Sequence, residues 1–290
     1  MDHEQRIRTV CAKHFDVDPE RVSIVKRLMG GMSNYTYAID VNGVPFTFRI
    51  PGKNAHHFVD RKVEAFHLPI VESWGISNET VHLDVETGEK IGVYVHGKPM
   101  SEDEPFNHVK DVAELLKGVH ESGFVTPFDY SPLARLYAYE SLIYAYGYSH
   151  NDQYANLKRN WRDLISKYGT HPTVFTHGDP QPSNFVITKN GLRLVDWEFT
   201  ANNDPFYDIA QFGNMNFDHA LELLEAYLDE APTTEDYNRL YFWRMFQCLQ
   251  WHNVAWYKHI IGLSEELGID FKKVAAMYLD KATAMRNSLK

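Results

Sequence analysis

The sequence predicts an α+β protein of two unequal lobes, a smaller one at residues 1–97 and a larger one at 98–290. Strand patterns concentrate in the smaller lobe, where apolar and polar residues alternate on both sides of Asn42-Gly43, as is typical of a β-hairpin. Beyond residue 107 the apolar residues recur mainly at helical spacing. We therefore expect a β-rich N-terminal lobe and a mainly helical C-terminal lobe.

The individual elements follow from local patterns in chain order. Phe46, Phe48 and Ile50 share one face of the strand after the Asn-Gly turn. Arg49 is therefore expected on the other face of that strand, opposite Thr36. The expected elements of the smaller lobe are a helix at 4–15, a strand at 22–28, the hairpin, a helix at 58–74, and strands at 80–85 and 90–96. After a Gly- and Pro-containing connection at 97–105, helices are expected at 107–121, 132–147, 150–168, 206–214, 218–229, 234–261 and 271–288.

Composition and charge restrict the class of protein. Of the 290 residues, 44% are hydrophobic and 23% are charged, as in an ordinary globular protein. A formal net charge of −10 argues against nonspecific nucleic-acid binding and is compatible with a cationic substrate. No apolar run reaches the ~20 residues that span a membrane, and the first residues lack a secretory-signal pattern. With two widely spaced cysteines, Cys11 and Cys248, we expect a cytoplasmic protein, and no pattern indicates an oligomeric state.

The most informative stretch joins a polar loop to a second hairpin. The loop His177-Gly178-Asp179-Pro180-Gln181-Pro182-Ser183-Asn184 precedes two apolar runs that flank Asn190-Gly191, and Asp196 follows. A two-residue turn at Asn190-Gly191 would place Asn184 opposite Trp197 and therefore beside Asp196, since opposed residues lie roughly 5 Å apart. Two oxygen ligands so placed can hold magnesium, which is bound by one or two protein ligands together with phosphates and waters. The pattern predicts a phosphoryl-transfer site.

The spacing of these polar residues is that of the protein-kinase catalytic loop. There an Asp orients the acceptor hydroxyl, as expected for Asp179, and an Asn and a later Asp bind magnesium, as expected for Asn184 and Asp196. His177 is expected to bond loop backbone or the metal-binding Asp rather than to act as a base. The alternative is an ordinary hairpin whose ends carry polar residues by chance. It would readily explain the polar loop alone or the hairpin alone, but it explains their combination less well.

The first hairpin indicates where nucleotide phosphates would bind. Gly30-Gly31-Met32-Ser33-Asn34 precedes it and its return strand carries Arg49, so backbone N–H groups and a guanidinium could converge on the same phosphates. Such a loop is by itself most often a flexible turn. Glu64, in the next helix, is the expected ion-pair partner of Arg49, although a solvated helix face would also explain it. Backbone groups of Tyr94 and Val95 are expected to bind adenine.

With these motifs, the sequence resembles the choline/ethanolamine kinase family, within the aminoglycoside-phosphotransferase-like group. The resemblance covers nearly the whole chain and is closest to bacterial choline kinases. It rests on the loop His177–Asn184, on Val195-Asp196-Trp197-Glu198-Phe199 and on Asn203-Asp204-Pro205. It implies a protein-kinase-like fold and transfer of the γ-phosphate of ATP to a hydroxyl, with Mg²⁺ as cofactor. It also implies Asp179 as the catalytic base, Asn184 and Asp196 as magnesium ligands, and Arg49 as the phosphate-binding cation.

The resemblance further implies a small cationic alcohol as acceptor. Quaternary ammonium groups bind well to aromatic faces, each contact contributing about 0.5–2 kcal/mol. Trp256 aligns with the family's second cage tryptophan, and the same aromatic helix offers Trp251. At least half of the rings of that helix, including Trp243 and Phe246, are expected to be core. The remaining expected acceptor-site residues are Gln181, Glu198, Phe199 and Asp204.

Two departures from the family leave the acceptor open. Asn253 stands where the family often has the other cage tryptophan, and Phe199 stands where it has tyrosine. Because Asn253 could hydrogen-bond a primary amine, ethanolamine remains an alternative to choline, as do thiamine and an aminoglycoside. An aminoglycoside would need an open, carboxylate-lined pocket, which the aromatic helix disfavours. A non-catalytic kinase-like binding protein is a further alternative, but such proteins typically lose one of the Asp or Asn residues that this chain retains.

Overall fold

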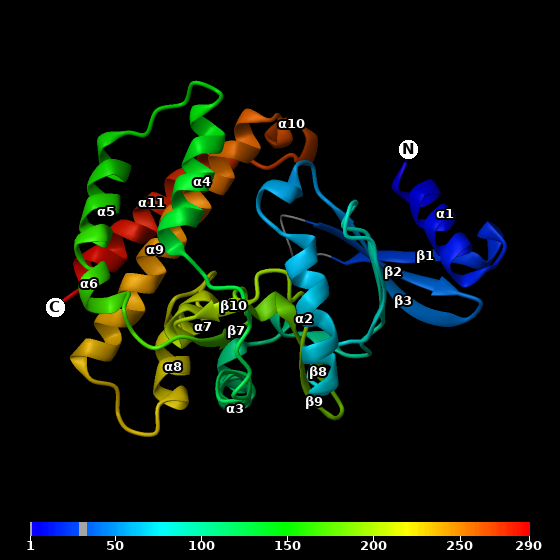
Figure 1. The fold of residues 1–290 in the computed structure, drawn as a ribbon, viewed down its shortest axis with the longest axis horizontal. Helices are drawn as coiled ribbons and strands as arrows, with labels where there is room; N and C mark the ends of the chain where they lie inside the picture. The colour runs from blue at the N-terminus through cyan, green and yellow to red at the C-terminus, as the bar shows by residue number, and fades with distance from the viewer. Residues whose placement is uncertain (1, 29–33) are drawn as a thin grey trace. The chain divides into compact units, whose positions relative to one another are not determined.

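The computed structural model describes residues 2–28 and 34–290, and the chain divides into two compact units. Their bounds are Met1–Leu115 with His177–Thr200 for the first unit, and Leu116–Thr176 with Ala201–Lys290 for the second. The first unit contains most of the strands and the second is mainly helical (Figure 1). The predicted α+β class, with a β-rich N-terminal region and a helical C-terminal region, is confirmed.

This grouping differs from the lobes expected at 1–97 and 98–290, because it places His177–Thr200 in the same unit as the N-terminal sheet. Lys98–Pro99 (β6) pairs with Phe185–Thr188 (β8) and so belongs to the three-stranded sheet of the second hairpin. Gly97 permits this approach, since a Cβ at that position would lie 2.4 Å from the carbonyl oxygen of Ile187. The functional division into lobes stays a prediction.

Five antiparallel strands form the main sheet of the first unit, in the order β1-β2-β3-β5-β4. Their bounds are Val22–Leu28 (β1), Asn34–Val41 (β2), Val44–Pro51 (β3), Thr80–Leu83 (β4) and Lys90–Val93 (β5). The predicted turn joins β2 to β3, with φ of 54° at Asn42 and 84° at Gly43, the positive values that a type I′ turn requires. Thr36 lies opposite Arg49, so the predicted register is confirmed.

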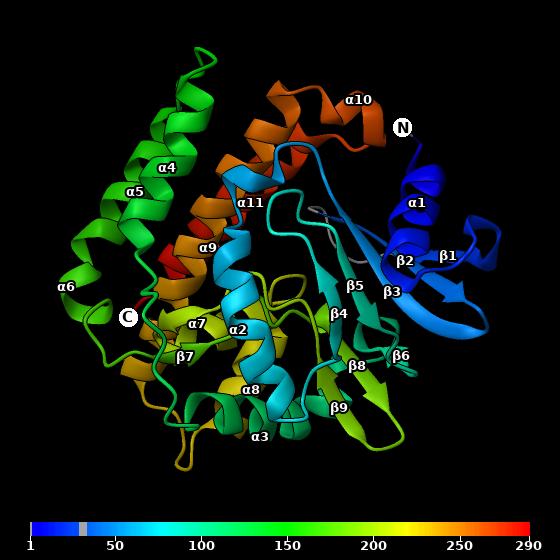
Figure 2. The same cartoon turned by 45° about the vertical axis from the view of Figure 1, so that its right-hand side comes forward.

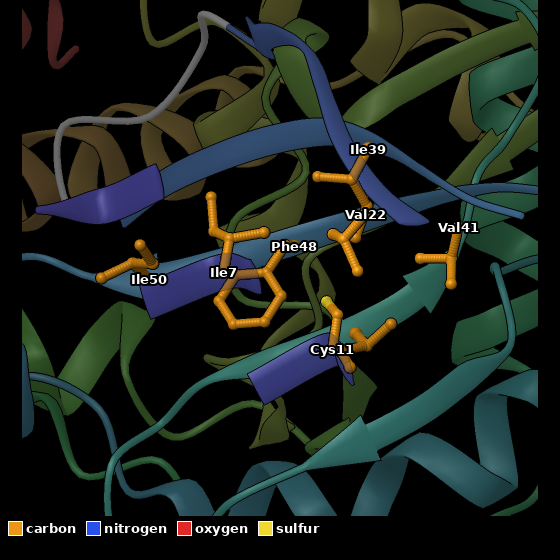
Figure 3. Packing of buried hydrophobic residues seen from close by; sticks show 8 residues of the cluster. Ile7, Cys11, Val22, Ile39, Val41, Phe48 and Ile50 are labelled. Carbon is orange, nitrogen blue, oxygen red and sulfur yellow. The ribbon is translucent and has the colours of Figure 1, made fainter. Parts of the chain in front are cut away.

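One face of this sheet is apolar and packs against helix α1 (His3–Phe15) (Figure 3). Ile7 and Cys11 of the helix lie against a set of nearly unexposed strand residues, which are Val22, Ile39, Val41, Phe48, Ile50 and Ile91. Side chains alternate along β3, so Arg49 points to the opposite face. There its ion pair with Glu64 joins the sheet to helix α2 (Arg61–Ser73). The sheet therefore separates an apolar core from a buried cluster of charges.

The predicted second hairpin is present, formed by β8 and Gly191–Leu194 (β9), but its turn lies one residue earlier than expected. Thr188 pairs with Gly191, so Lys189 and Asn190 form the turn. Positive φ falls on Gly191 (99°), as in a type I turn followed by a glycine bulge. The expected pairing of Asn184 with Trp197 is therefore wrong. Instead, the carbonyl of Asn184 accepts from the N–H of Val195 at 2.9 Å, directly before Asp196.

The second unit is helical and contains the long aromatic helix α9 (Thr234–Ile260), which lies along α11 (Phe271–Ser288) (Figures 1 and 2). Trp243 and Phe246 are buried core residues, as predicted. Short strands Val174–Thr176 (β7) and Ala201–Asn203 (β10), which the sequence patterns did not predict, pair with each other. The other helices are Val109–His120 (α3, across the unit boundary), Pro132–Tyr144 (α4), Asp152–Asp163 (α5), Ile165–Tyr168 (α6), Pro205–Phe212 (α7), Asp218–Tyr227 (α8) and Leu263–Leu267 (α10). None of the helices in the described part of the chain is long and apolar enough to cross a membrane.

Candidate active site

The polar loop of the first unit turns at Gly178, whose φ is +85°. A Cβ at this position would lie 2.3 Å from the carbonyl oxygen of Phe199, so the backbone of the loop and the backbone after Glu198 meet in a space that only glycine leaves open. Phe199, expected at the acceptor site, thus has its backbone against the polar loop. No role was predicted for Gly178, although a glycine between His177 and Asp179 is typical of such a turn.

His177 connects the polar loop to the residue before Asp196 through hydrogen bonds of its ring. Its Nδ1 atom accepts from the N–H of Asp179 at 3.1 Å, and its Nε2 atom lies 3.0 Å from the carbonyl oxygen of Val195. An imidazole that accepts at Nδ1 and donates at Nε2 is neutral. The ring is fully buried and packs edge-on against Trp197. The expectation that His177 bonds loop backbone is confirmed.

The carboxylate of Asp179 is held by two neighbours and is 7% exposed. Gln181 Nε2 donates to Asp179 Oδ2 at 3.1 Å, and Asn184 Nδ2 donates to the same oxygen at 3.3 Å. Asn184 Nδ2 also donates to the Asp179 carbonyl at 2.8 Å. Gln181 therefore orients Asp179, which is a contact other than the acceptor contact predicted for it.

Asn184 and Asp196 present oxygen atoms that suit a hard cation. The amide nitrogen of Asn184 faces Asp179, and its Oδ1 accepts no hydrogen bond within residues 2–28 and 34–290. Asp196 is one-third exposed at its side chain, and the structure gives its Oδ2 no donor from the described residues. Asp196 also has φ 68°, a left-handed conformation that costs of order 1–3 kcal/mol for a non-glycine residue. Backbone strain of this kind concentrates at functional sites.

Arg49 and Glu64 form the ion pair that the sequence predicted. Both guanidinium Nη atoms bind the carboxylate, at 2.6 and 2.8 Å, and Glu64 is fully buried. Arg49 Nη1 also lies 3.5 Å from Asp196 Oδ1. The solvated-face alternative for Glu64 is therefore wrong, and the expected phosphate-binding cation lies beside the expected metal ligand.

Two further cations, which the sequence analysis missed, reach Glu64. Arg61 Nη1 binds it at 2.7 Å and Lys90 Nζ at 3.2 Å. Lys90 lies directly opposite Arg49 on the neighbouring strand, an arrangement of like charges that is unfavourable unless a carboxylate lies between them. Burial alone would raise the pKa of Glu64, but Lys90, Arg49 and Arg61 hold it far below its usual range. The cross-strand pair of cations depends on the pairing of β3 with β5, which the register of the β2–β3 hairpin does not give.

Glu198, expected at the acceptor site, lies in the same cluster of charges. Its carboxylate accepts from Arg61 at 2.6 Å, from Asn34 at 3.1 and 3.0 Å, and from Arg49 at 3.4 Å. Burial and the neighbouring Asp196 raise the pKa of Glu198, against the opposing effect of Arg61 and Arg49. These contacts tie Glu198 to the nucleotide-side cations. Asn34, expected to bind phosphate, is one of its donors.

The other residues predicted to bind the nucleotide belong to the glycine-containing loop and to the segment after β5. Gly30, Gly31 and Ser33 lie outside the described residues. Tyr94 and Val95 follow β5 and are half-buried, and the N–H of Tyr94 donates to the carbonyl of Pro45 at 3.4 Å. Their predicted contact with adenine stays a prediction.

The other predicted acceptor residues belong to the second unit. Asp204 caps α7 by accepting from the N–H of Phe206, and it binds Arg239 through both carboxylate oxygens at 2.9 and 2.7 Å. Trp251 is half-buried. Trp256 is half-buried too, and its ring centroid lies 4.5 Å from that of Tyr148. Tyr148 thus supplies a second ring beside Trp256 that the aromatic-helix pattern could not reveal.

Asn253 is not available to a substrate amine, contrary to the prediction. It is fully buried, its Nδ2 donates to Tyr154 Oη at 2.8 Å, and its Oδ1 lies 2.8 Å from His150 Nε2. Tyr154 in turn donates to Glu140 at 2.6 Å. Asn253 therefore belongs to an internal hydrogen-bond network of the helices.

Comparison with known proteins gives concordant matches. A model described as "Phosphotransferase enzyme family" matches residues 24–243. The protein LicA of Haemophilus influenzae is 26% identical over 276 residues, which are 90% of this chain and 79% of that protein. The crystal structure of choline kinase LicA from Streptococcus pneumoniae superposes with a TM-score of 0.77 at 20% identity, covering 99% of this chain and 100% of the other. A choline/ethanolamine kinase family protein from Mesorhizobium loti gives 0.71 at 25% identity, covering 90% and 87%.

Proposed function

We propose that this chain, which belongs to the phosphotransferase enzyme family, transfers the γ-phosphate of ATP to the hydroxyl of choline or a closely related amino alcohol. One observation carries this proposal most: a buried, oriented Asp179 lies in the loop just before the second hairpin, and Asp196 lies just after it, beside the Arg49–Glu64 pair. The choice of acceptor is supported by relatives whose names specify choline or ethanolamine.

Asp179 acts as the proton acceptor for the substrate hydroxyl. Gln181 and Asn184 hold its carboxylate in one orientation, which lowers the entropic cost of reaching the reactive geometry. The proton moves late in phosphoryl transfer, as charge on the phosphoryl group is neutralised, so a carboxylate such as that of Asp179 can accept it. His177 does not compete for this role, because both of its ring nitrogens are already bonded to backbone.

Asn184 and Asp196 are the residues that would hold magnesium. Their oxygens match its preference for hard ligands, and it needs only one or two carboxylates when phosphates supply the remaining positions. Bound there, the ion offsets the negative charge of the phosphates.

Arg49 binds the phosphates from the sheet. Its contacts with Glu64 are short, whereas its Nη1 contacts with Glu198 and Asp196 are long, at 3.4 and 3.5 Å. A nucleotide phosphate can take over the long contacts while the short ones keep the guanidinium in place.

Trp256 contributes to binding of the acceptor's ammonium group. An indole face is the best natural site for a quaternary ammonium, and Tyr148 lies beside it. Because Asn253 is committed to Tyr154 and His150, the structure offers no support for a dedicated primary-amine contact at that position. Choline is therefore favoured over ethanolamine.

The test is a coupled ADP-release assay with Mg·ATP and four acceptors: choline, ethanolamine, thiamine and kanamycin. We expect ADP release that depends on magnesium, with the highest kcat/KM for choline. A preference for kanamycin or thiamine would move the chain to another acceptor class within the same chemistry. ADP release that no acceptor raises above the acceptor-free rate, in protein that binds Mg·ATP, would instead support the non-catalytic alternative.

A further inference from the structure

Arg61 occupies a position where a cation is unfavourable. It is the first residue of α2, and the free N–H groups at this end of a helix carry partial positive charge. Asp60 satisfies two of those groups, on Lys62 and Val63, in the usual way of an N-cap. Arg61 nevertheless is 7% exposed, whereas Lys62 next to it is exposed to solvent. Contacts of the guanidinium itself must offset this placement.

Those contacts close a ring of alternating charges. Arg61 Nη1 binds Glu64 Oε2 at 2.7 Å and Glu198 Oε2 at 2.6 Å. Arg49 binds the same two carboxylates, with its Nη1 atom 2.6 Å from Glu64 Oε1 and 3.4 Å from Glu198 Oε2. The four side chains, Arg49, Glu64, Arg61 and Glu198, are each 7% exposed or less.

The turn between β4 and β5 is shaped around the two arginines. Gly88, with φ +75°, accepts from Arg49 Nη2 through its carbonyl at 3.2 Å. A Cβ on Gly88 would lie 2.8 Å from Nε of Arg61. The turn therefore binds one arginine and makes room for the other.

The two carboxylates of the ring depend on Arg61 to different degrees. Without Arg61, Glu64 would keep both bonds from Arg49 and the bond from Lys90. Among the described residues, Glu198 would keep the amide of Asn34 and the 3.4 Å contact with Arg49. A buried carboxylate that loses its closest cation is left uncompensated, and it then attracts the next-nearest cation more strongly. That next cation is the Nη1 group of Arg49.

We propose that Arg61 is a positioning residue for phosphate binding: it neutralises Glu198, so that Arg49 Nη1 stays directed by Glu64 and open to the phosphates of a nucleotide. This inference rests on the proposed function for the identity of the ligand. It adds that Arg61 acts through Glu198 and touches no phosphate itself.

The test measures the Kd of Mg·ATP by calorimetry, without acceptor, in wild type, Arg61→Gln, Lys62→Gln and the double variant Arg61→Gln with Glu198→Gln. Arg61→Gln should raise Kd at least ~10-fold, the effect of one lost charged hydrogen bond. Lys62→Gln removes the same charge from the same helical turn and should leave Kd unchanged. The double variant removes both the cation and the carboxylate that it neutralises, and should return Kd to within ~3-fold of wild type.

Two results would overturn the inference. One is a double variant that binds as weakly as Arg61→Gln, because Arg61 would then contact phosphate directly. The other is a lower Tm for Arg61→Gln with an unchanged Kd, which would mean a purely structural role. If Arg61→Gln does not fold, the double variant, which leaves no unpaired charge, decides alone: a Kd more than ~10-fold above wild type contradicts the inference. Wild-type protein with no affinity for Mg·ATP would overturn the proposed function as well.

Discussion

Asp179 shows how short-range contacts prepare one side chain for chemistry. Its carboxylate accepts hydrogen bonds from Gln181 and Asn184, and its N–H donates to His177. Gly178, directly before it, lies where a Cβ atom would clash with the neighbouring backbone. The three hydrogen bonds come from within six residues along the chain, whereas the space at Gly178 is limited by the backbone of Phe199. The orientation of Asp179 is therefore a property of the loop sequence itself, which explains why the motif could be recognised before the fold was known.

Replacing Asp179 with Asn should lower kcat by about 10²–10⁴-fold, because the proton acceptor is lost while shape and hydrogen-bonding capacity are nearly kept. The KM for ATP should stay within about threefold of wild type, since Arg49 and Glu64 are unaffected. Steady-state kinetics in the ADP-release assay measure both quantities. Asp163→Asn, at an exposed carboxylate of α5, is the matched control. Wild-type kcat in Asp179→Asn would remove Asp179 from the mechanism.

Among the secondary-structure elements, hairpins were predictable to different depths. The first hairpin agreed in turn and register, because Asn42 and Gly43 both adopt the positive φ that their sequence favours. The second hairpin formed with its turn at Lys189-Asn190, because Gly191 alone supplied the positive φ. An Asn-Gly pair is compatible with both geometries, and contacts outside the turn choose between them. One such contact is the bond from Val195 N–H to Asn184 O.

The charge cluster on α2 was only partly predictable for a different reason. Glu64 could be assigned to Arg49 from strand register and helix position, but Arg61 and Lys90 join them through tertiary contacts. In the sequence, Glu198 is only the residue two positions after the expected metal ligand Asp196. Its bond to Arg61, 137 residues away along the chain, is a tertiary contact. Sequence spacing places residues on a face of an element, whereas ion pairs between elements depend on the packing of the whole sheet and helix.

Helix α9 contributes the prediction on the acceptor. Trp256→Ala should raise the KM for choline by about 2–30-fold, the equivalent of one cation–π contact of roughly 0.5–2 kcal/mol, with a smaller effect on ethanolamine. Trp256→Phe keeps an aromatic face and should lie between wild type and Trp256→Ala. Steady-state kinetics with both acceptors provide the measurement. An unchanged KM for choline in Trp256→Ala would exclude Trp256 from the acceptor site.

The contact between α9 and α11 gives a prediction for pH. His252 is 2% exposed, its Nδ1 donates to the carbonyl of Ala275 at 2.9 Å, and burial lowers its pKa from 6.5 to about 4. The unfolded chain then binds the proton more tightly than the folded one, so stability present at pH 7 is lost as pH falls below about 6.5. Between pH 7 and pH 5 this amounts to about 2 kcal/mol. Urea unfolding should show that loss in wild type and a smaller one in His252→Gln. An equal loss of unfolding free energy between pH 7 and pH 5 in the two proteins would contradict this role of His252.

Across the whole molecule, the phosphate- and metal-binding candidates and the acceptor candidates divide between the two units. Arg49, Glu64, Asp179, Asn184 and Asp196 belong to the first unit, and Trp251 and Trp256 belong to the second. The fold class and nearly all helices were predictable, because amphipathic periodicity is a local property. Short strands β7 and β10 were not, since three residues carry no period and their pairing is set by distant segments. The role of Asn253 was not predictable, because a polar side chain in a helix can bind either a substrate or another helix.

Direct detection of the phosphorylated product is the most decisive measurement. Wild-type protein would be incubated with Mg·ATP and choline and followed by ³¹P nuclear magnetic resonance, with Asp179→Asn as the inactive comparison. In the wild-type sample, we expect the γ-phosphate signal to be replaced by that of a phosphate monoester of choline, in equal amount to the ADP formed. In the Asp179→Asn sample, the γ-phosphate signal should persist. ADP accompanied by inorganic phosphate without the ester, or ATP left unconsumed by the wild-type protein, would contradict phosphoryl transfer to choline.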